Sequence, residues 1–379
     1  MQCVFLNHGL QIHYSGTVRP CCMLQVDQDY SKQNQVSKID LQTWHQTDHI
    51  AAMKQKLLLD QWPKECTRCE RSESSNRGDS MRLNGERSYG HYQNDDLVVE
   101  LRPGNTCNFA CQTCWPQASS RVASFYERAD IKFVPADSTF WSYDVIAPVL
   151  HRIKHLIILG GEPFYDKQCR RFFSWLAQQN AHPRLTMFTN GSMIDFDFLR
   201  HYQNHINLVF SLDATGLAAE YVRMGTEWSV VLQNFQQCKQ LNNVEVRVNI
   251  TVSPYNYAYL RDLVTLLIQD WPAVVSWENA ANNQNSKFMS CRTISDSQKP
   301  RVSGMVRDAL QIVERANIED MQRINSINAL RSLIHDIETQ PYSQHEHAAL
   351  KQFIERMDRV KQMDIRHYCP EVADYLEIS

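Results

Sequence analysis

Short apolar runs alternate with longer amphipathic stretches through the middle of the chain, from about residue 97 to residue 280. Runs of this length are typical of β-strands, and the stretches between them are typical of helices. Strands that alternate with helices form parallel sheets, so the pattern predicts an α/β fold of βα units. Six units rather than eight predict an open, partial barrel. The expected strands are Leu97–Leu101, Leu156–Leu159, Leu185–Phe188, Leu208–Leu212, Val244–Val252 and Val274–Trp277, and the expected helices are Phe140–Leu150, Cys169–Gln179 and Val230–Leu241.

The pattern differs on either side of this middle part. Residues 1 to about 30 predict a hairpin whose turn is Ser15–Gly16, and Leu41–Leu59 predicts a helix. Serine, asparagine and glycine within residues 70–96 predict a polar linker. From Lys299 onward, apolar residues recur at steps of three and four, which predicts helices.

These changes of pattern divide the chain into three expected parts. They are a cysteine-rich module over 1–90, the partial barrel over 97–280, and a helical region over 299–379. The mostly polar segment Asn279–Gln298 is expected to be a loop that lines or covers the mouth of the barrel.

Charge and hydropathy exclude several classes of protein. The formal net charge is −3 and no run of basic residues occurs, which argues against a dedicated nucleic-acid binder. No apolar run approaches the roughly 20 residues that span a bilayer, and the N-terminus does not have the pattern of a secretory signal. We therefore expect a cytoplasmic protein. Twelve cysteines in such a protein favour metal or redox chemistry over disulfides.

Two motifs follow expected strands and carry the candidate chemistry. Cys107, Cys111 and Cys114 form a CxxxCxxC pattern just after the first strand, and three thiolates leave one position of a metal site for a ligand from outside the protein. The second strand ends in Gly160–Pro163, a GGEP sequence. Its glycines allow close approach of backbone to a ligand, and Glu162 can accept hydrogen bonds from an ammonium group.

Together these motifs resemble those of radical S-adenosylmethionine (SAM) enzymes. The resemblance implies a partial (β/α)6 barrel in which Cys107, Cys111 and Cys114 hold a [4Fe-4S] cluster whose fourth iron binds SAM. It also implies reductive cleavage of SAM to a 5′-deoxyadenosyl radical that abstracts hydrogen from a substrate. The SAM-binding residues implied in this way are Gly160, Gly161, Glu162, Asn190, Ser211, Asp213, Arg223 and Asn249.

Simpler interpretations of several of these residues stay open. Gly160–Pro163 could be a tight turn with a capping carboxylate, and Asp213 could cap a helix while Arg223 is solvated. The sequence also departs from the family at Thr113, where an aromatic residue often precedes the third cysteine. Phe109 or Trp115 would then have to contact the adenine.

The N-terminal cysteines form a second candidate site. A lone cysteine, a GxVxPCC hairpin, a helix and a closing CxxC resemble the SPASM/twitch modules that hold auxiliary clusters in radical SAM enzymes. By this resemblance a second [4Fe-4S] cluster would be held by Cys3, Cys66 and Cys69 with one of Cys21 and Cys22, and Cys21 is favoured. Four thiolates would equally satisfy a structural zinc ion.

The substrate is less constrained than the cofactors. The SPASM/twitch resemblance favours a peptide or protein side chain, with a small metabolite as the second hypothesis, and it implies an electron donor such as flavodoxin or ferredoxin. A third hypothesis is a non-catalytic zinc or iron–sulfur protein that only retains the barrel. The intact cysteine and GGEP motifs argue against it.

Overall fold

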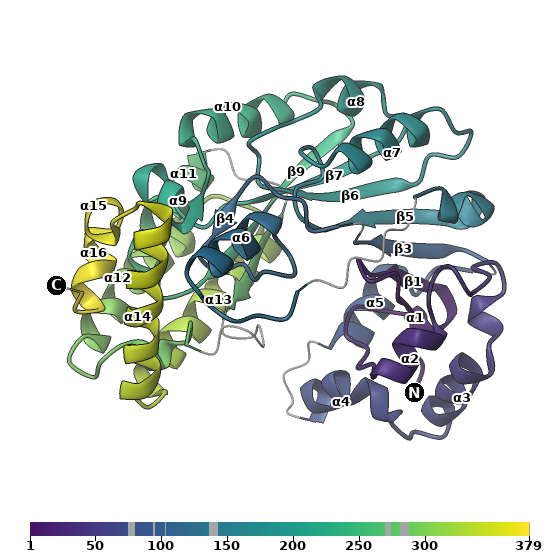
Figure 1. The fold of residues 1–379 in the computed structure, drawn as a ribbon, viewed down its shortest axis with the longest axis horizontal. Coiled ribbons are helices and arrows are strands. Elements are labelled where there is room, and N and C mark those ends of the chain that lie inside the picture. The colour runs from purple at the N-terminus through teal and green to yellow at the C-terminus, as the bar shows by residue number, and fades with distance from the viewer. Residues whose placement is uncertain are drawn as a thin grey trace. The chain divides into compact units, whose positions relative to one another are not determined.

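The α/β class and the helical C-terminal region predicted from the sequence are confirmed in a computed structural model. It describes residues 1–74, 80–93, 95–102, 104–135, 143–269, 274–280 and 288–378. The main sheet is largely parallel and has eight strands in the order β10-β9-β7-β6-β5-β3-β1-β2 (Figure 1). The six predicted strands follow one another in this sheet in chain order. They are β3 (Leu97–Leu101), β5 (Ile153–Ile158), β6 (Arg184–Thr189), β7 (Ile206–Ser211), β9 (Val244–Val252) and β10 (Val274–Asn279).

The chain forms two compact units, which are described separately. Unit 1 contains Met1–Asn105, Ala136–Met187 and His201–Ile206. Unit 2 contains Thr106–Pro135, Phe188–Arg200 and Asn207–Ser379.

In unit 1 the predicted N-terminal hairpin is present and also extends the sheet. Strand β1 (Gly9–Ile12) pairs antiparallel with β2 (Val18–Arg19) and parallel with β3. All four residues of β1 are buried, and the strand lies between β3 and β2 in the sheet. The turn between β1 and β2 contains Gly16 at φ +75°, a conformation that favours glycine. That β1 would join the parallel sheet was not predicted.

Two predictions for unit 1 are corrected by the structure. The helix expected over Leu41–Leu59 is a 3₁₀ turn, Trp44–Gln46, followed by α3 (Asp48–Leu58), because Thr47 between them is extended. The expected linker over 70–96 instead contains the end of α4 (Thr67–Ser74) and all of α5 (Met81–Tyr89). Its residues 75–79 and 94 lie outside the described residues.

The residues that indicated a linker have other roles. Ser80 caps α5 by accepting a hydrogen bond from the Leu83 backbone (3.1 Å). Gly85 lets α5 pack closely on α1 (Val4–His8), since a Cβ atom at this position would lie 2.3 Å from the ring of Phe5. These small residues therefore cap α5 and let it pack on α1, and they do not form a linker.

Among the barrel helices, two were predicted with shifted ends and one was predicted with the wrong type. Helix α7 covers Lys167–Ala177 and α10 covers Trp228–Cys238. In place of the helix expected over Phe140–Leu150, the structure has a 3₁₀ helix over Tyr143–Arg152 that contains Pro148, whose ring opposes α-helical hydrogen bonding. Phe140 itself lies outside the described residues, as do residues 281–287 of the expected mouth loop.

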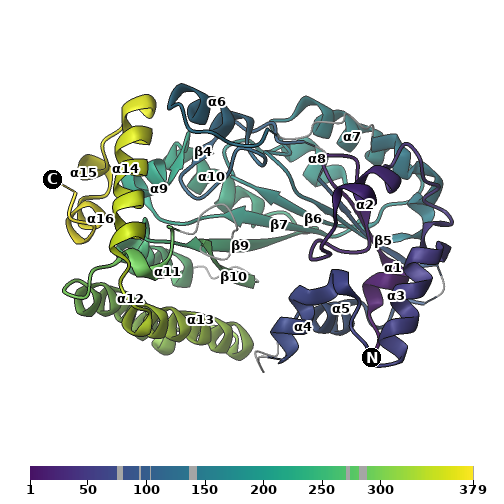
Figure 2. The same ribbon diagram turned by 60° about the horizontal axis from the view of Figure 1, so that its bottom comes forward.

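The C-terminal helices of unit 2 begin where the sequence predicted, at Lys299. Figures 1 and 2 show α12, α13 and α14 as the long helices of this region, and α12 packs on α13 and on α11 (Leu260–Gln269). Helix α14 also packs against α6 (Ser120–Arg128), the helix that follows the CxxxCxxC segment. The helices are α12 (Lys299–Arg315), α13 (Asp320–Thr339), α14 (Gln344–Lys361), α15 (Ile365–Tyr368) and α16 (Pro370–Tyr375). No helix in the described ranges is long and apolar enough to cross a membrane.

Candidate active site

The CxxxCxxC segment of unit 2 is held by short backbone pairings. Cys111 lies on β4 (Ala110–Cys111), which pairs antiparallel with β8 (Arg223–Met224) so that Cys111 faces Arg223 in the register. The Cys114 backbone donates to the carbonyl of Cys111 (3.3 Å). At the far end, Ser119 donates to the Phe109 carbonyl (2.9 Å) and caps α6. The loop is therefore fixed on both sides.

The three thiols lie close enough to influence one another. Burial raises the pKa of Cys114, and the neighbouring Cys111 and Cys107 raise it further. A bound metal ion would instead lower the pKa of these thiols, because coordination deprotonates a thiol. In the described ranges, no three side chains of His, Cys, Asp or Glu lie close enough together to bind a single metal ion. The cysteines of an iron–sulfur cluster each bind a different iron and therefore stand further apart.

Asn190 is linked directly to this loop. Its amide donates to the side-chain oxygen of Asn108 (2.8 Å), and its own oxygen accepts from the backbone (2.9 Å) and hydroxyl (2.7 Å) of Ser192. Asn108 in turn donates to the Ser192 hydroxyl (2.8 Å). The turn after β6 thus positions Asn108, which lies between the first two cysteines of the motif. Sequence reasoning missed Asn108 and Ser192.

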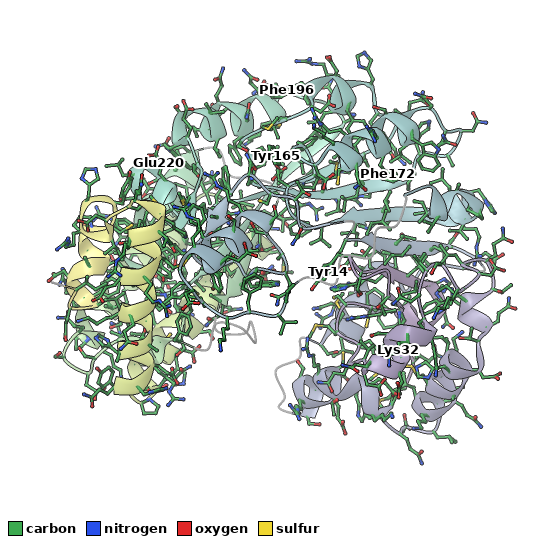
Figure 3. All side chains as sticks on the ribbon, in the orientation of Figure 1. Tyr14, Lys32, Tyr165, Phe172, Phe196 and Glu220 are labelled. Carbon is green, nitrogen blue, oxygen red and sulfur yellow. The ribbon has the colours of Figure 1, made fainter. Side chains whose placement is uncertain are left out.

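Asp213 and Arg223 form a buried ion pair in unit 2. The Nη1 of Arg223 donates to Oδ2 of Asp213 (2.8 Å), and their side chains are 15% and 0% exposed. Asp213 also accepts from the Thr251 backbone (2.8 Å). The alternative of a solvated arginine is therefore wrong. Glu220 on α9 (Gly216–Val222), labelled in Figure 3, accepts from the Trp228 backbone (3.4 Å) and so joins the two sides of the turn that contains Arg223.

One polar group of Arg223 is left over. Its Nε is buried and has no hydrogen-bond partner among the described residues. Burial by itself lowers the pKa of the guanidinium, but the neighbouring Cys111 and Asp213 together outweigh it, so the pKa is raised. An unsatisfied N–H beside Cys111 is a site where an anionic ligand would gain a hydrogen bond.

The remaining predicted residues of unit 2 lie on neighbouring strands. Ser211 ends β7 and is half-buried, while Asn249 is buried on β9, where its carbonyl accepts from the Leu212 backbone (3.1 Å). Phe109 is 1% exposed and packed against Gly225, so it is enclosed by protein. Of the two aromatic candidates for contact with adenine, half-buried Trp115 is the accessible one.

The GGEP strip lies in unit 1, in the turn after β5. Gly160 has φ +140°, which favours glycine, and the Gly161 backbone donates to the Gly104 carbonyl (3.1 Å). Glu162 is 1% exposed, and its Oε1 accepts from the Phe164 backbone (3.2 Å). The next helix, α7, is capped by Asp166 instead (Oδ1 to the Gln168 backbone, 2.7 Å). Glu162 is therefore not the cap of α7. Exposed Tyr165, labelled in Figure 3, follows in the same turn.

The N-terminal cysteines of unit 1 also influence one another. Burial raises the pKa of Cys66 to about 12, and Cys3 and Cys69 contribute. For Cys21 the pKa is raised by burial, then by Cys22, Cys3 and Cys69. The pKa of Cys22 is raised mainly by burial and then by Glu100, and Cys69 contributes least. Cys3 and Cys21 pack against the same small core of Val4, Phe5 and Val98.

Lys361 is a residue near the CxxxCxxC segment that sequence reasoning missed. It is the last residue of α14, and only 5% of it is exposed. Its ammonium donates to the Ala110 carbonyl and to the side-chain oxygen of Gln112, both at 3.0 Å. The sequence carries no signal for this contact, because a lysine in the last turn of a helix is ordinarily solvated.

Known proteins resemble this chain in structure but not detectably in sequence. No protein-family model and no curated protein matches it. Solved structures that match include native anSMEcpe with bound AdoMet (16% identity, TM-score 0.42, 57% of this chain and 60% of that chain). Others are Streptococcus suis SuiB bound to S-adenosylmethionine (14%, 0.38, 82% and 70%) and TYW1 with a lysine-pyruvate adduct (15%, 0.34, 59% and 76%). The chain thus spans 60% of the length of anSMEcpe, and its function has to be inferred from its own residues.

Proposed function

We propose that this protein is a radical SAM enzyme in which Cys107, Cys111 and Cys114 hold a [4Fe-4S] cluster. The observation that carries the proposal is the buried guanidinium of Arg223 beside Cys111, with an Nε–H that finds no acceptor in the described part of the chain. Three thiolates leave one iron for a ligand from outside the protein, and the planar arginine fork suits the carboxylate of SAM. The cysteines and the unsatisfied N–H therefore fit the two cofactors together.

The bound cofactors would supply the chemistry, which is one-electron reductive cleavage of SAM to a 5′-deoxyadenosyl radical that abstracts hydrogen from substrate. The protein's residues would bind and orient SAM. In this proposal Glu162 accepts from its amino group, and Arg223 donates to its carboxylate while Asp213 holds the guanidinium in place. Ser211 at the end of β7 and Asn249 within β9 are the candidates for its polar groups, and Gly160, Gly161 and Asn190 are the further proposed SAM-binding residues.

For the N-terminal cysteines we propose a second [4Fe-4S] cluster held by Cys3, Cys21, Cys66 and Cys69. Cys21 packs with Cys3 on the Val4 core, and its pKa is raised by Cys3, which is not among the groups that act on Cys22; both observations support Cys21 over Cys22 as the fourth ligand. Four thiolates would leave no iron open for substrate, so its role would be electron transfer. A structural zinc ion is the competing occupant, and metal analysis separates the two.

The substrate we propose is a peptide or protein side chain, because the N-terminal cysteine module resembles those of enzymes that modify such substrates. A small metabolite is the second candidate. The electron donor would be a flavodoxin or ferredoxin, and SAM cleavage driven by either protein in place of dithionite would support this.

The test is the iron, sulfide and zinc content after anaerobic reconstitution. We expect about eight irons per wild-type chain and about four when Cys107, Cys111 and Cys114 are all replaced by alanine. The control is Cys169→Ala with Cys238→Ala, which removes two buried cysteines outside both motifs and should leave the iron unchanged. About four irons falling to none, with zinc retained, would make the N-terminal site a zinc site. No iron in the wild type would contradict the proposal and favour a non-catalytic protein.

A further inference from the structure

Lys361 places a positive charge against the segment that contains the proposed cluster ligands. Its two acceptors, the Ala110 carbonyl and Gln112 Oε1, stand on either side of Cys111. Gln112 is itself held to the end of α9, since its backbone donates to the Val222 carbonyl (2.8 Å). The ammonium therefore touches the chain immediately before and after one cysteine.

This charge is not neutralised by an ion pair among the described residues. The nearest acidic residue along α14, Asp358, accepts instead from the Tyr221 hydroxyl (2.8 Å) and the Ile365 backbone (2.9 Å). Two other cations lie beside the segment: Arg223 is paired with Asp213, and Arg121 donates to the Asn108 carbonyl. Burial lowers the pKa of Lys361 to about 8, and it outweighs the longer-range attraction between Asp358 and the ammonium. Further negative charge beside the ammonium would therefore stabilise it.

The position of Lys361 is fixed by the packing of α14 on α6. Arg356 of α14 donates to the Ala129 carbonyl (2.6 Å), and Arg128 of α6 donates to the Val360 carbonyl (2.8 Å). Helix α14 ends at Lys361 and is capped by Gln362, which has the left-handed conformation at φ +56°. The lysine thus lies where α14 packs on α6, with its ammonium 5.9 Å from the centre of the Phe125 ring of α6.

We propose that Lys361 is a positioning residue of the SAM-binding cluster, which holds the Cys111 segment and raises the reduction potential of the cluster. The inference rests on the proposed function. A [4Fe-4S] cluster with three thiolates is anionic, and reduction adds one more negative charge. A fixed positive charge nearby stabilises the reduced form more than the oxidised one. The C-terminal helical region would in this way take part in cofactor chemistry.

The test compares Lys361→Met with Lys361→Arg, and uses Arg359→Met as the matched control. Arg359 is exposed in the same helical turn, so its loss removes one charge without touching the Cys111 segment. The quantity measured is the midpoint potential of the cluster whose electron paramagnetic resonance signal changes when SAM is added. Unfolding of each apoprotein is followed in parallel. We expect Lys361→Met to shift the potential negatively by at least about 59 mV, which is a tenfold change in the reduction equilibrium. Lys361→Arg and Arg359→Met should stay near the wild-type value.

The outcomes separate this inference from the proposed function. A wild-type chain that binds no iron would defeat the proposed function itself. A loaded Lys361→Met variant with the wild-type potential would overturn only the role of the lysine. If Lys361→Met does not fold, Lys361→Gln, which retains an amide donor, is measured in its place. Failure of both apoproteins to fold would make Lys361 a residue of the hydrophobic packing and overturn the inference.

Discussion

Arg223 combines one satisfied and one unsatisfied donor in a buried place. Its Nη1 is held by Asp213 (2.8 Å), while its Nε has no acceptor in the ranges that the structure describes. An arginine offers donors in a fixed planar fork, whereas a lysine offers a single ammonium. If the free edge binds the carboxylate of SAM, a lysine would keep the charge and lose the paired hydrogen bonds.

We therefore expect Arg223→Lys to weaken SAM binding by roughly 10- to 100-fold, the value of one hydrogen bond to a charged group. Iron content should not change. Equilibrium dialysis of SAM against the reconstituted protein measures the effect. Arg247→Lys is the control, because Arg247 also pairs with a carboxylate, that of half-buried Glu245 on β9, and lies outside the proposed site. Wild-type affinity in Arg223→Lys would exclude the guanidinium from the SAM site.

His45 predicts a pH dependence of stability. It is buried, its Nε2 donates to the Gly9 carbonyl (2.8 Å), and burial lowers its pKa from 6.5 to about 4. Between pH 6.5 and 4 the unfolded chain binds a proton at this imidazole and the folded chain does not. The contribution of the neutral, buried ring to the free energy of unfolding is therefore complete above pH 6.5 and is lost as pH falls toward 4. The loss amounts to roughly 3 kcal/mol.

Comparison of wild type with His45→Gln, which retains a donor for Gly9, tests this. Urea unfolding between pH 8 and pH 5 should show wild type losing stability faster than the variant as pH falls. Parallel pH profiles for the two proteins would show that His45 is not buried as a neutral ring.

At the scale of elements, the contact of α5 with α1 depends on a glycine inside a helix. A Cβ atom at Gly85 would lie 2.3 Å from the Phe5 ring, whereas one at Gly304 in α12 would meet nothing within 4 Å. Gly85→Ala should therefore destabilise the fold by about 1–3 kcal/mol through overpacking, even though alanine is the better helix former.

Gly304→Ala is the matched substitution and should stabilise by roughly 0.5–1 kcal/mol. Urea unfolding midpoints measure both changes. The prediction fails if both substitutions shift the midpoint in the same direction.

Elements with a strong local signal were predicted from the sequence, and elements that depend on distant contacts were not. Strand β3 was predicted with its observed ends because it is a short, nearly continuous apolar run, and α12 with its observed start because apolar residues recur there at helical steps. Helix α5 was missed because serine and glycine are also typical of linkers. Only the hydrogen bond of Ser80 with Leu83 and the packing of Gly85 on Phe5 show that they belong to a helix. The site shows the same limit. The cysteine motifs are local, but Lys361 reaches Ala110 across 251 positions.

At the scale of the whole molecule, the two cysteine sets belong to different compact units. Cys3, Cys21, Cys66 and Cys69 lie in unit 1, and Cys107, Cys111 and Cys114 lie in unit 2. Each set is held by the packing of its own unit. Cys3 and Cys21 pack on the Val4 core, while Cys111 is held by β8. Loss of one cluster should therefore not remove the ligands of the other.

We accordingly expect Cys66→Ala with Cys69→Ala to retain about four of about eight irons. The remaining cluster should still give an electron paramagnetic resonance signal that changes on addition of SAM, because its three thiolates and Arg223 are untouched. The reciprocal variant with Cys107, Cys111 and Cys114 replaced should retain iron whose signal ignores SAM. If the double variant loses all its iron, the N-terminal cysteines are needed for the integrity of unit 2 as well. Assignment of separate roles to the two sites would then be wrong.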